Sequence, residues 1–405
     1  MQGRWTRTLT NRMRDGRSRL AALCLSVATA IGVVTAIGVA DPAQAQGGVD
    51  PSGFVPVAIF GADDRVPVPQ RYQRLQDSVG VLFNLRAKTV CTAFCVGDAV
   101  IATAGHCIYR PDGAAKDKST PPRLADFWFA RGYDATRDYA RIAGYAGGAA
   151  AQNVLAGSQK LNLTPPIDAT SDWALIRLAR PVCTKHALTV EPLSTPEVQI
   201  RATEQKVFQI AYHRDYTQWR PAYSKPCEVK RSFNGADWST ISKDFSNSDQ
   251  LLLHTCDTGG ASSGSPLFVD TQTGPKVIGI NVGTYVQSRV LTQNGQTIQR
   301  LKPETIANTG VAASAFADKL EAFKTATILT TTTQLRELQV RLLLRQLYTG
   351  PTDGTYGPAL KTSIESFERQ TKRPITGLAT AELLRLLQDE TSNIPSSTKG
   401  GVKVP

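Results

Sequence analysis

The sequence predicts a mainly β protein that ends in a small helical domain, and two observations lead to this class. Short β-type runs separated by clusters of Gly, Pro, Asp and Asn dominate residues 77–311. Helical spacing of apolar residues appears only at Ala312 and returns after residue 334. Many short strands with long loops indicate a β-sandwich or a pair of β-barrels, here followed by three short amphipathic helices.

Individual strands and one closing helix can be assigned from these patterns. The helical stretch Ala312–Lys324 places Phe316, Leu320 and Phe323 on one face, so we expect it to close the β domain. The runs that favour strands are Val79–Leu85, Ala99–Thr103, Trp173–Leu178, Lys206–Tyr212, Leu251–His254, Pro266–Val269 and Lys276–Val282.

Length and composition fit an ordinary globular protein. The 405 residues allow two or three domains, and 41% of them are hydrophobic and 20% charged. Of the formal net charge of +12, residues 1–45 contribute four, because they contain six Arg against Asp15 and Asp41. The remaining charge is scattered without a Lys/Arg block, which argues against a nucleic-acid partner.

The first 45 residues are typical of a signal peptide. Six Arg precede an apolar run from Leu20 to Ala40, and residues 43–45 read Ala-Gln-Ala, so we expect cleavage before Gln46. The apolar run is long enough to cross a bilayer, and an uncleaved membrane anchor stays open as the alternative. In both cases the chain is exported, to the periplasm, the cell envelope or the medium.

Export also decides how the cysteines are interpreted. Besides Cys24 in the apolar run, the chain has an even number of cysteines, which indicates up to three disulfides in an oxidising compartment. These six residues allow fifteen pairings. They are Cys91, Cys95, Cys107, Cys183, Cys227 and Cys256.

Composition shifts divide the exported chain. Residues 46–76 are rich in Pro and Gly and lack a sustained period, which predicts an extended arm or a propeptide. The β domain follows over residues 77–324, and the Thr-rich stretch 325–333 is the expected linker. Residues 334–390 form the predicted helical domain, and residues 391–405 a disordered tail.

Three separated segments each offer one member of a Ser/His/Asp site. They are Thr103–Cys107 with His106, Ser171–Ile176 with Asp172, and Ser262–Leu267. Acyl transfer needs such a set, because a serine hydroxyl is a poor nucleophile until an imidazole takes its proton and a carboxylate holds that imidazole in the correct tautomer.

With these motifs the chain resembles the trypsin-like serine endopeptidases, and within them the bacterial glutamyl-endopeptidase branch. Thr103–Cys107 matches the pattern T-A-[AG]-H-C, Asp172–Ile176 matches D-x-A-L-[IL], and Ser263–Pro266 matches S-G-[GS]-P. The resemblance covers roughly Ser78–Lys324. It implies a chymotrypsin-like double antiparallel β-barrel with the Ser/His/Asp site in the cleft between the barrels.

The resemblance also implies the role of each residue. Ser263 would be the nucleophile, His106 the general base and then acid, and Asp172 the orienting carboxylate. The backbone N–H groups of Ser263 and Ala261 would form the oxyanion hole. The family usually has Gly at the place of Ala261, so a positive φ there would strain the turn. The Asp that precedes the nucleophile in trypsin-type zymogens is here Ser262, which implies no activating ion pair.

Disulfide pairs follow from the same resemblance. A bridge between Cys91 and Cys107 matches the family's disulfide around the histidine loop. We expect Cys227 to pair with Cys256 next, which leaves Cys95 with Cys183.

Substrate preference is less clearly indicated. Asp257 lies six residues before Ser263, where trypsin-like enzymes keep the carboxylate that binds Arg or Lys, but the bacterial branch also opens this loop with Cys-Asp-Thr without that role. Both interpretations stay open. Asn281 takes the place of the pocket-wall His of glutamyl endopeptidases, so we expect no preference for Glu.

We expect neither a metal nor another cofactor. The remaining histidines, His186, His213 and His254, have no carboxylate or cysteine partners at metal-ligand spacing, and the sequence has no H-E-x-x-H motif. We therefore interpret all three as structural.

The C-terminal helices resemble the small peptidoglycan-binding domain attached to many bacterial cell-wall enzymes. We expect peptidoglycan to bind through polar and aromatic groups near Tyr356, and the alternative that the loop residues only shape the fold stays open. The matching residues are Leu338-Gln339, the loop 353–358, Phe367-Glu368 and Thr376-Gly377.

Together these features predict an exported serine endopeptidase that hydrolyses protein or peptide substrates through an acyl-enzyme and is targeted to the bacterial envelope. A membrane is a partner only if the signal segment stays uncleaved. One alternative is cleavage of the peptide cross-links of peptidoglycan itself. The other is a non-catalytic envelope-binding protein with a degenerate protease fold, which Ala261 keeps open.

Overall fold

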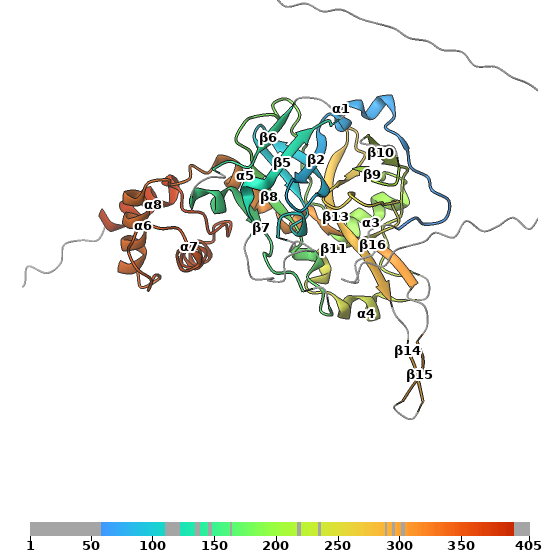
Figure 1. Ribbon diagram of the computed structural model, residues 1–405. Coiled ribbons are helices and arrows are strands. Elements are labelled where there is room, and N and C mark those ends of the chain that lie inside the picture. The colour runs from blue at the N-terminus through green and yellow to red at the C-terminus, as the bar shows by residue number, and fades with distance from the viewer. Residues whose placement is uncertain are drawn as a thin grey trace, which may run out of the picture. The chain divides into compact units, whose positions relative to one another are not determined.

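The computed structural model describes most of the chain after residue 57 (Figure 1). The predicted signal segment, the start of the predicted arm and most of the predicted tail lie outside the described residues. Within those residues, no helix combines the length and the apolar character needed to cross a membrane. The described ranges are 58–109, 122–133, 138–144, 148–162, 164–216, 220–233, 236–287, 290–293, 296–300 and 304–392.

Seven antiparallel strands form the first sheet, in the order β6-β5-β2-β3-β4-β8-β7. Neighbouring side chains of β3 enter different apolar clusters, Phe94 in one and Cys95 in the other, because successive residues of a strand point to opposite faces. Both faces of the sheet are therefore buried here. The strands are β2 (Val79–Asn84), β3 (Thr89–Gly97), β4 (Val100–Thr103), β5 (Phe127–Arg131), β6 (Tyr139–Arg141), β7 (Val154–Ala156) and β8 (Ala174–Arg177).

The second sheet is also antiparallel and has seven strands, in the order β1-β10-β9-β12-β13-β16-β11. A separate two-stranded ribbon of β14 and β15 lies between β13 and β16 in the sequence. The strands are β1 (Val66–Pro67), β9 (Val207–Tyr212), β10 (Pro221–Ser224), β11 (Leu251–His254), β12 (Pro266–Val269), β13 (Lys276–Gln287), β14 (Val290–Gln293), β15 (Gln296–Arg300) and β16 (Glu304–Ala312). This architecture is the predicted mainly β double sheet.

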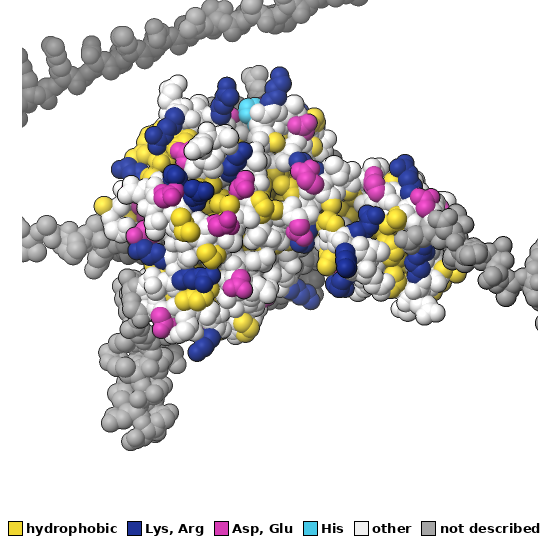
Figure 2. Space-filling model, turned by 180° about the vertical axis from the view of Figure 1, so that it is seen from behind, with side chains coloured by type: hydrophobic (Ala, Val, Ile, Leu, Met, Phe, Trp, Pro, Cys, Tyr) yellow, Lys and Arg dark blue, Asp and Glu magenta, His cyan; other side chains and the backbone are white. Residues whose placement is uncertain are grey.

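The two sheets share the largest apolar cluster, which contains Phe94 from the first sheet and Phe208 and Phe268 from the second. The rings of Phe208 and Phe268 stack with their centroids 5.2 Å apart. On the face drawn in Figure 2, Lys and Arg side chains are interspersed with those of Asp and Glu. The sheets therefore meet over one continuous core, and segments from both can contribute to one site.

The described part of the predicted arm, residues 58–76, packs onto the second sheet. Val66 and Pro67 form the edge strand β1, which pairs with β10. Tyr72 is buried, stacks on Phe208 and donates a hydrogen bond from its hydroxyl to Asp270 at 2.8 Å. This segment is thus built into the β domain.

Short helices connect the strands, and of these only the closing helix α5 was predicted. Helix α3 (Thr195–Thr203) begins with a capping box, in which Ser194 Oγ accepts from Glu197 N–H and the Glu197 carboxylate accepts from Ser194 N–H. Helix α5 (Ala317–Thr325) begins later than the predicted Ala312, because β16 continues to that residue. The others are α1 (Gln73–Gln76), α2 (His106–Tyr109) and α4 (Trp238–Ile241).

Three helices form the C-terminal module: α6 (Thr332–Leu344), α7 (Pro358–Gln370) and α8 (Ala381–Ser392). Leu338, Ile364 and Leu387, one from each helix, are fully buried in a single apolar cluster. Part of the predicted linker belongs to this module as well, since Leu329 is buried in the same cluster and its N–H donates to the Ala379 carbonyl.

Candidate active site

His106 and Asp172 form a tightly bound pair at the edge of the first sheet. His106 follows β4, and Asp172 lies two residues before β8, the strand that pairs with β4. Oδ1 of the Asp172 carboxylate accepts a hydrogen bond from the His106 backbone N–H at 2.7 Å. Oδ2 of the same carboxylate lies 2.7 Å from His106 Nδ1. A carboxylate can only accept, so Nδ1 carries the proton and Nε2 is left as the basic nitrogen.

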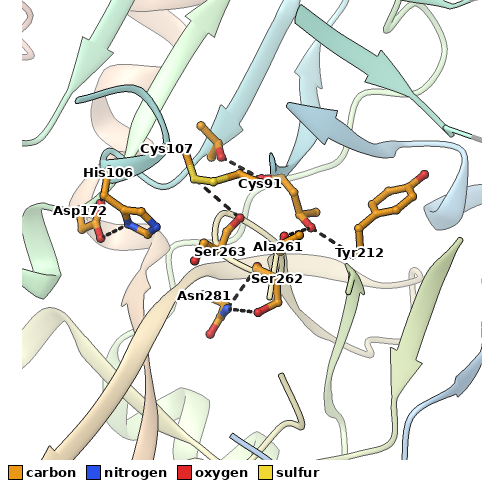
Figure 3. The surroundings of a disulfide bond; sticks show 11 residues. Cys91, His106, Cys107, Asp172, Tyr212, Ala261, Ser262, Ser263 and Asn281 are labelled. Atoms are coloured by element: carbon orange, nitrogen blue, oxygen red, sulfur yellow. Dashed lines mark hydrogen bonds and ion pairs between the residues drawn. A yellow bond between two sulfur atoms is a disulfide. The ribbon is translucent and has the colours of Figure 1, made fainter. Parts of the chain in front are cut away.

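Ser263 comes from the other sheet and faces the opposite side of the imidazole. It lies in a tight turn just before β12. In Figure 3 the ring of His106 lies between Asp172 and Ser263. The structure thus brings together the three residues that the sequence motifs singled out, although 91 residues separate Asp172 from Ser263 in the chain.

The turn at Ser263 requires a glycine after it. Gly264 has φ +85°, and a Cβ at this position would collide with the Thr103 hydroxyl and the Thr92 carbonyl. The Gly264 N–H donates to the Asn281 carbonyl at 2.7 Å. Backbone therefore approaches backbone here too closely for any side chain.

Two backbone N–H groups of this turn have no partner among the described residues. Within the described part of the chain, neither Ala261 N–H nor Ser263 N–H donates a hydrogen bond, whereas Ser262 N–H and Gly264 N–H both do. Ala261 has φ +82°, the left-handed region that disfavours residues with a Cβ. The strain anticipated at Ala261 is therefore present, and the two free donors are the pair expected to form an oxyanion hole.

Thr92 of β3 joins the two sheets beneath this turn, and sequence reasoning missed it. Its hydroxyl donates to the Ala261 carbonyl at 2.8 Å and accepts from Tyr212 N–H at 3.0 Å. Its own N–H donates to the Ser263 carbonyl at 2.9 Å. One buried Thr therefore holds both residues of the expected oxyanion hole, a contact across 169 residues that no local motif reveals.

Asn281 lies behind the turn at Ser263 and is only 1% exposed. Its Nδ2 donates to the carbonyl of Ser262 at 3.2 Å and lies 3.3 Å from the Ser262 hydroxyl. Its Oδ1 is 3.1 Å from His254 Nε2, so the imidazole nitrogen is the donor of that bond. In this structure Asn281 supports the turn through Ser262 instead of facing open solvent as a pocket wall (Figure 3).

Asp257 is buried and already has partners from the chain itself. Its carboxylate accepts from Phe60 N–H at 2.8 Å and from Asp64 N–H at 2.9 Å. Burial raises the pKa of this carboxyl, while the two N–H donors act in the opposite direction. The residue considered above for binding Arg or Lys side chains thus bonds to the segment before β1.

Three disulfides brace the region, and they join the expected pairs. Cys91–Cys107 links β3 to the residue after His106. The other two are Cys95–Cys183 and Cys227–Cys256. The two groups of Cys and His side chains that lie close enough to hold a metal ion, among the described residues, both consist of disulfide cysteines plus His106 or His254. Sulfur atoms in disulfides offer no thiolate ligands.

The two other histidines that were interpreted as structural also have ordinary surroundings. His213 is buried, and its Nδ1 accepts a hydrogen bond from the Gly259 backbone N–H at 3.0 Å. Burial lowers its pKa to about 3. Burial also lowers the pKa of His186, which is partly exposed.

Comparisons with known proteins match both parts of the chain. The trypsin family model matches residues 69–296, and the model of a peptidoglycan binding domain matches residues 331–387. A solved structure of a Glu endopeptidase in complex with MPD is similar, with 17% sequence identity, a TM-score of 0.43, and coverage of 66% of this chain and 99% of its own. No curated protein matches the chain.

Proposed function

Because the chain belongs to the trypsin family, whose model matches more than half of it, we propose that Ser263, His106 and Asp172 are its catalytic triad and that its C-terminal module directs this serine endopeptidase to the bacterial envelope. The proposal includes export, with hydrolysis of protein or peptide substrates outside the cytoplasm.

One observation carries the catalytic part: the Asp172 carboxylate binds both the backbone N–H and the Nδ1–H of His106. Two bonds to one residue fix the position of the ring as well as its tautomer. The His106 side chain is 11% exposed and the Asp172 side chain 5%, so water competes little for either bond. A histidine held in this way by a buried carboxylate is what general-base catalysis requires.

In the proposed mechanism, His106 Nε2 takes the proton of the Ser263 hydroxyl while Oγ attacks the carbonyl carbon of the peptide bond. The imidazolium that forms is stabilised by Asp172 and then donates its proton to the leaving amine, so that an acyl-enzyme on Ser263 remains. A water molecule, deprotonated by the same nitrogen, hydrolyses this ester and restores the free serine.

The negative charge of the tetrahedral intermediate develops on the former carbonyl oxygen. The N–H groups of Ala261 and Ser263 can donate to this oxygen, since both lack a partner among the described residues. Loss of one such donor typically lowers the rate by about 10²–10³-fold. The strained φ of Ala261 is therefore functionally important, because it sets the direction of the peptide N–H groups at the turn.

Envelope targeting is supported by the match of residues 331–387 to a peptidoglycan binding domain and by the disulfides, which are typical of an oxidising compartment. In the module, Tyr356 donates from its hydroxyl to the Gly377 carbonyl at 2.7 Å. Its ring is half-buried, and this hydrogen bond fixes the orientation of the ring.

Labelling with a fluorophosphonate probe tests the catalytic part. We expect the purified exported form to be labelled, and Ser263→Ala and His106→Ala to lose labelling while they remain folded. Digestion of denatured casein by the same preparation, against no release of peptides from purified sacculi, would identify protein as the substrate. A folded, oxidised protein that takes up no probe would contradict the proposal and favour a binding protein.

Sedimentation with purified sacculi tests the targeting part. The full chain with Ser263→Ala is expected to sediment with sacculi and to be released by soluble peptidoglycan fragments. Glu368→Ala is the matched variant, because it removes a contact inside the module and leaves the protease domain unaltered. No sedimentation of the full chain, or sedimentation that soluble peptidoglycan fragments do not reduce, would contradict a role of the module in targeting.

A further inference from the structure

Residues 58–65, which we call the N-terminal segment, cross the loop of residues 257–261 that leads to the nucleophile. Ala58 N–H donates to the Thr258 carbonyl at 3.2 Å, and Thr258 N–H donates to the Ala58 carbonyl at 3.0 Å. Such a reciprocal pair fixes both the distance and the direction of two antiparallel stretches of chain. The segment therefore helps to fix the start of the loop, together with the bonds of Asp257 N–H to the Ser224 hydroxyl and of the Thr258 hydroxyl to Asn308.

Asp257 makes the second connection. Its Oδ1 accepts from Phe60 N–H and its Oδ2 from Asp64 N–H, at 2.8 Å and 2.9 Å. The residue is 2% exposed, so these bonds are shielded from water. Hydrogen bonds to a charged acceptor are the stronger kind, and their loss leaves the donors unsatisfied. One buried carboxylate thus binds backbone 193 and 197 residues earlier in the chain.

The third connection is a packing contact, in which Arg65 and its partner Asp215 lie against Gly259. The Arg65 side chain is 3% exposed and its guanidinium pairs with Asp63 at 2.8 Å and with Asp215 at 2.9 Å. A Cβ on Gly259 would collide with the Asp215 carboxylate and approach the Arg65 guanidinium. Gly259 N–H donates to His213 Nδ1, so this residue is enclosed on both sides.

These three connections end where the strained turn begins. The Gly260 carbonyl accepts from Arg214 N–H at 2.7 Å, and the next residue is Ala261 with φ +82°. A residue with a Cβ stays in this region only when its surroundings determine the conformation. Thr92 holds Ala261 from one side. From the other side the loop is fixed by Asp257 and Thr258, which bond to the segment, and by Gly259, which bonds to His213 and packs against Arg65 and Asp215.

We propose that the N-terminal segment is a permanent part of the catalytic domain and that Asp257 is a positioning residue, which through this segment holds the oxyanion turn at Ala261 in its active conformation. The inference rests on the proposed function. It assigns the Asp257 carboxylate to the backbone of the enzyme itself and not to an Arg or Lys side chain of the substrate.

The first test identifies the start of the active form. The fluorophosphonate-labelled protein is purified by gel filtration and its intact mass and N-terminal sequence are measured. We expect residues 58–65 to be retained in every labelled species, whatever is removed before Ala58. A labelled species that begins after Arg65 and has lost the preceding peptide would overturn the proposal.

The second test separates positioning from substrate recognition. Asp257→Ala and Asp257→Asn are compared with Tyr72→Phe, which removes a hydrogen bond to Asp270 from the neighbouring stretch but touches no residue of the loop. For peptides with Arg, Lys, Glu or Leu before the cut bond, we expect Asp257→Ala to lower kcat about 10²-fold with little change in KM. Asp257→Asn keeps one acceptor, so its kcat should lie between those of Asp257→Ala and the wild type. Tyr72→Phe should have the kcat and KM of the wild type.

Two results would overturn the positioning role. A rise in KM confined to the Arg and Lys peptides would assign Asp257 to substrate recognition, and unchanged kcat and KM would make its contacts irrelevant to catalysis. Tryptophan fluorescence first establishes that each variant is folded, and where Asp257→Ala is not, Asp257→Asn and the mass measurement decide. Wild-type protein that takes up no probe at Ser263 contradicts the proposed function. Labelled wild type with equally fast labelling of Asp257→Ala contradicts only this inference.

Discussion

The protease domain and the C-terminal module each bury a carboxylate that accepts hydrogen bonds from backbone N–H groups, but they bind very different parts of the chain. Asp257 binds residues 193 and 197 positions away. Glu368 binds Thr376 and Gly377, eight and nine positions away. Burial raises the pKa of both carboxyls. A buried carboxylate that accepts from backbone N–H groups thus closes a long loop in the protease domain and a short loop in the module. The entropy cost of closing the long loop is larger.

Covalent cross-links follow the same division. The protease domain has a disulfide across 88 residues, between Cys95 and Cys183, and two shorter ones. The module contains no cysteine. Its buried Gln339 instead binds Gly354 N–H and the Thr355 carbonyl, 15 and 16 residues away. The protease site thus depends on contacts distant in sequence. The three helices of the module are held together mainly by neighbours, although Ala379 N–H donates to Gln152 of the protease domain and Leu378 packs in its core.

The largest effect is expected from the longest cross-link. Replacing both Cys95 and Cys183 by Ala removes a loop closure of 88 residues, which should lower the free energy of unfolding of the protease domain by about 4–5 kcal/mol. All five Trp precede residue 239, so urea unfolding followed by Trp fluorescence reports on this domain alone.

Amide hydrogen exchange of α6, α7 and α8 is the control for this double substitution. If the module is held together locally, its exchange rates remain as in the wild type at low urea concentration. Matching losses of protection in the two regions would break the comparison, because they would make the module dependent on the long-range contacts of the protease domain.

Acid should also act on one region only. All four histidines precede the module, and burial lowers the pKa of His213 to about 3 and of His254 to about 4. The unfolded chain takes up these protons near pH 6.5, so stability is present above that pH and is lost as the pH falls. Between pH 7 and pH 5 the loss should be about 4 kcal/mol. The carboxyls with raised pKa act in the opposite direction.

Urea unfolding at intervals between pH 8 and pH 5 measures this dependence. His213→Asn keeps an acceptor for Gly259 N–H but removes one titrating group, so it should halve the slope of stability against pH in this range. A slope unaffected by the substitution would show that His213 takes up its proton over the same pH range in the folded and the unfolded protein.

A smaller effect is expected inside the module. Glu368→Ala leaves the N–H groups of Thr376 and Gly377 without acceptors, which should cost about 1–3 kcal/mol. Amide exchange of α7 should rise, while probe labelling of Ser263 stays unchanged. Slower labelling in this variant would mean that the module supports the protease site, contrary to the comparison. Glu365→Ala, also on α7 but paired with Lys361 on the surface, is the control expected to change little.

The same division explains what the sequence allowed us to predict. All seven strands assigned from apolar runs are strands of the two sheets, because a buried strand needs a continuous apolar stretch whatever it pairs with. Strand β3 was missed, although Thr92 within it holds the nucleophile turn. Helix α3 was missed despite its capping box Ser194–Glu197, a local signal that could have revealed it.

The site residues divide in the same way. His106, Asp172 and Ser263 lie in short motifs, so local reasoning could single them out. Asp257 was considered for substrate binding because of its spacing from Ser263, and Asn281 because the resemblance places it in the pocket wall. In the structure their partners lie in the N-terminal segment and behind the turn. Such contacts join stretches that the sequence does not relate, and only the fold reveals them.

The smallest effect expected is at Ala261, where distant contacts hold a strained residue. Ala261→Gly relieves the cost of φ +82° for a residue with a Cβ, and should raise the free energy of unfolding by up to about 1 kcal/mol even after the entropy lost by Gly. Ala202→Gly in helix α3 is the matched control and should lower it by about 1 kcal/mol. The free energies of unfolding of both variants are measured by urea unfolding followed by Trp fluorescence. Equal losses in the two variants would mean that the fold does not force Ala261 into the left-handed region, and would remove the reason for assigning Asp257 and Thr92 to its support.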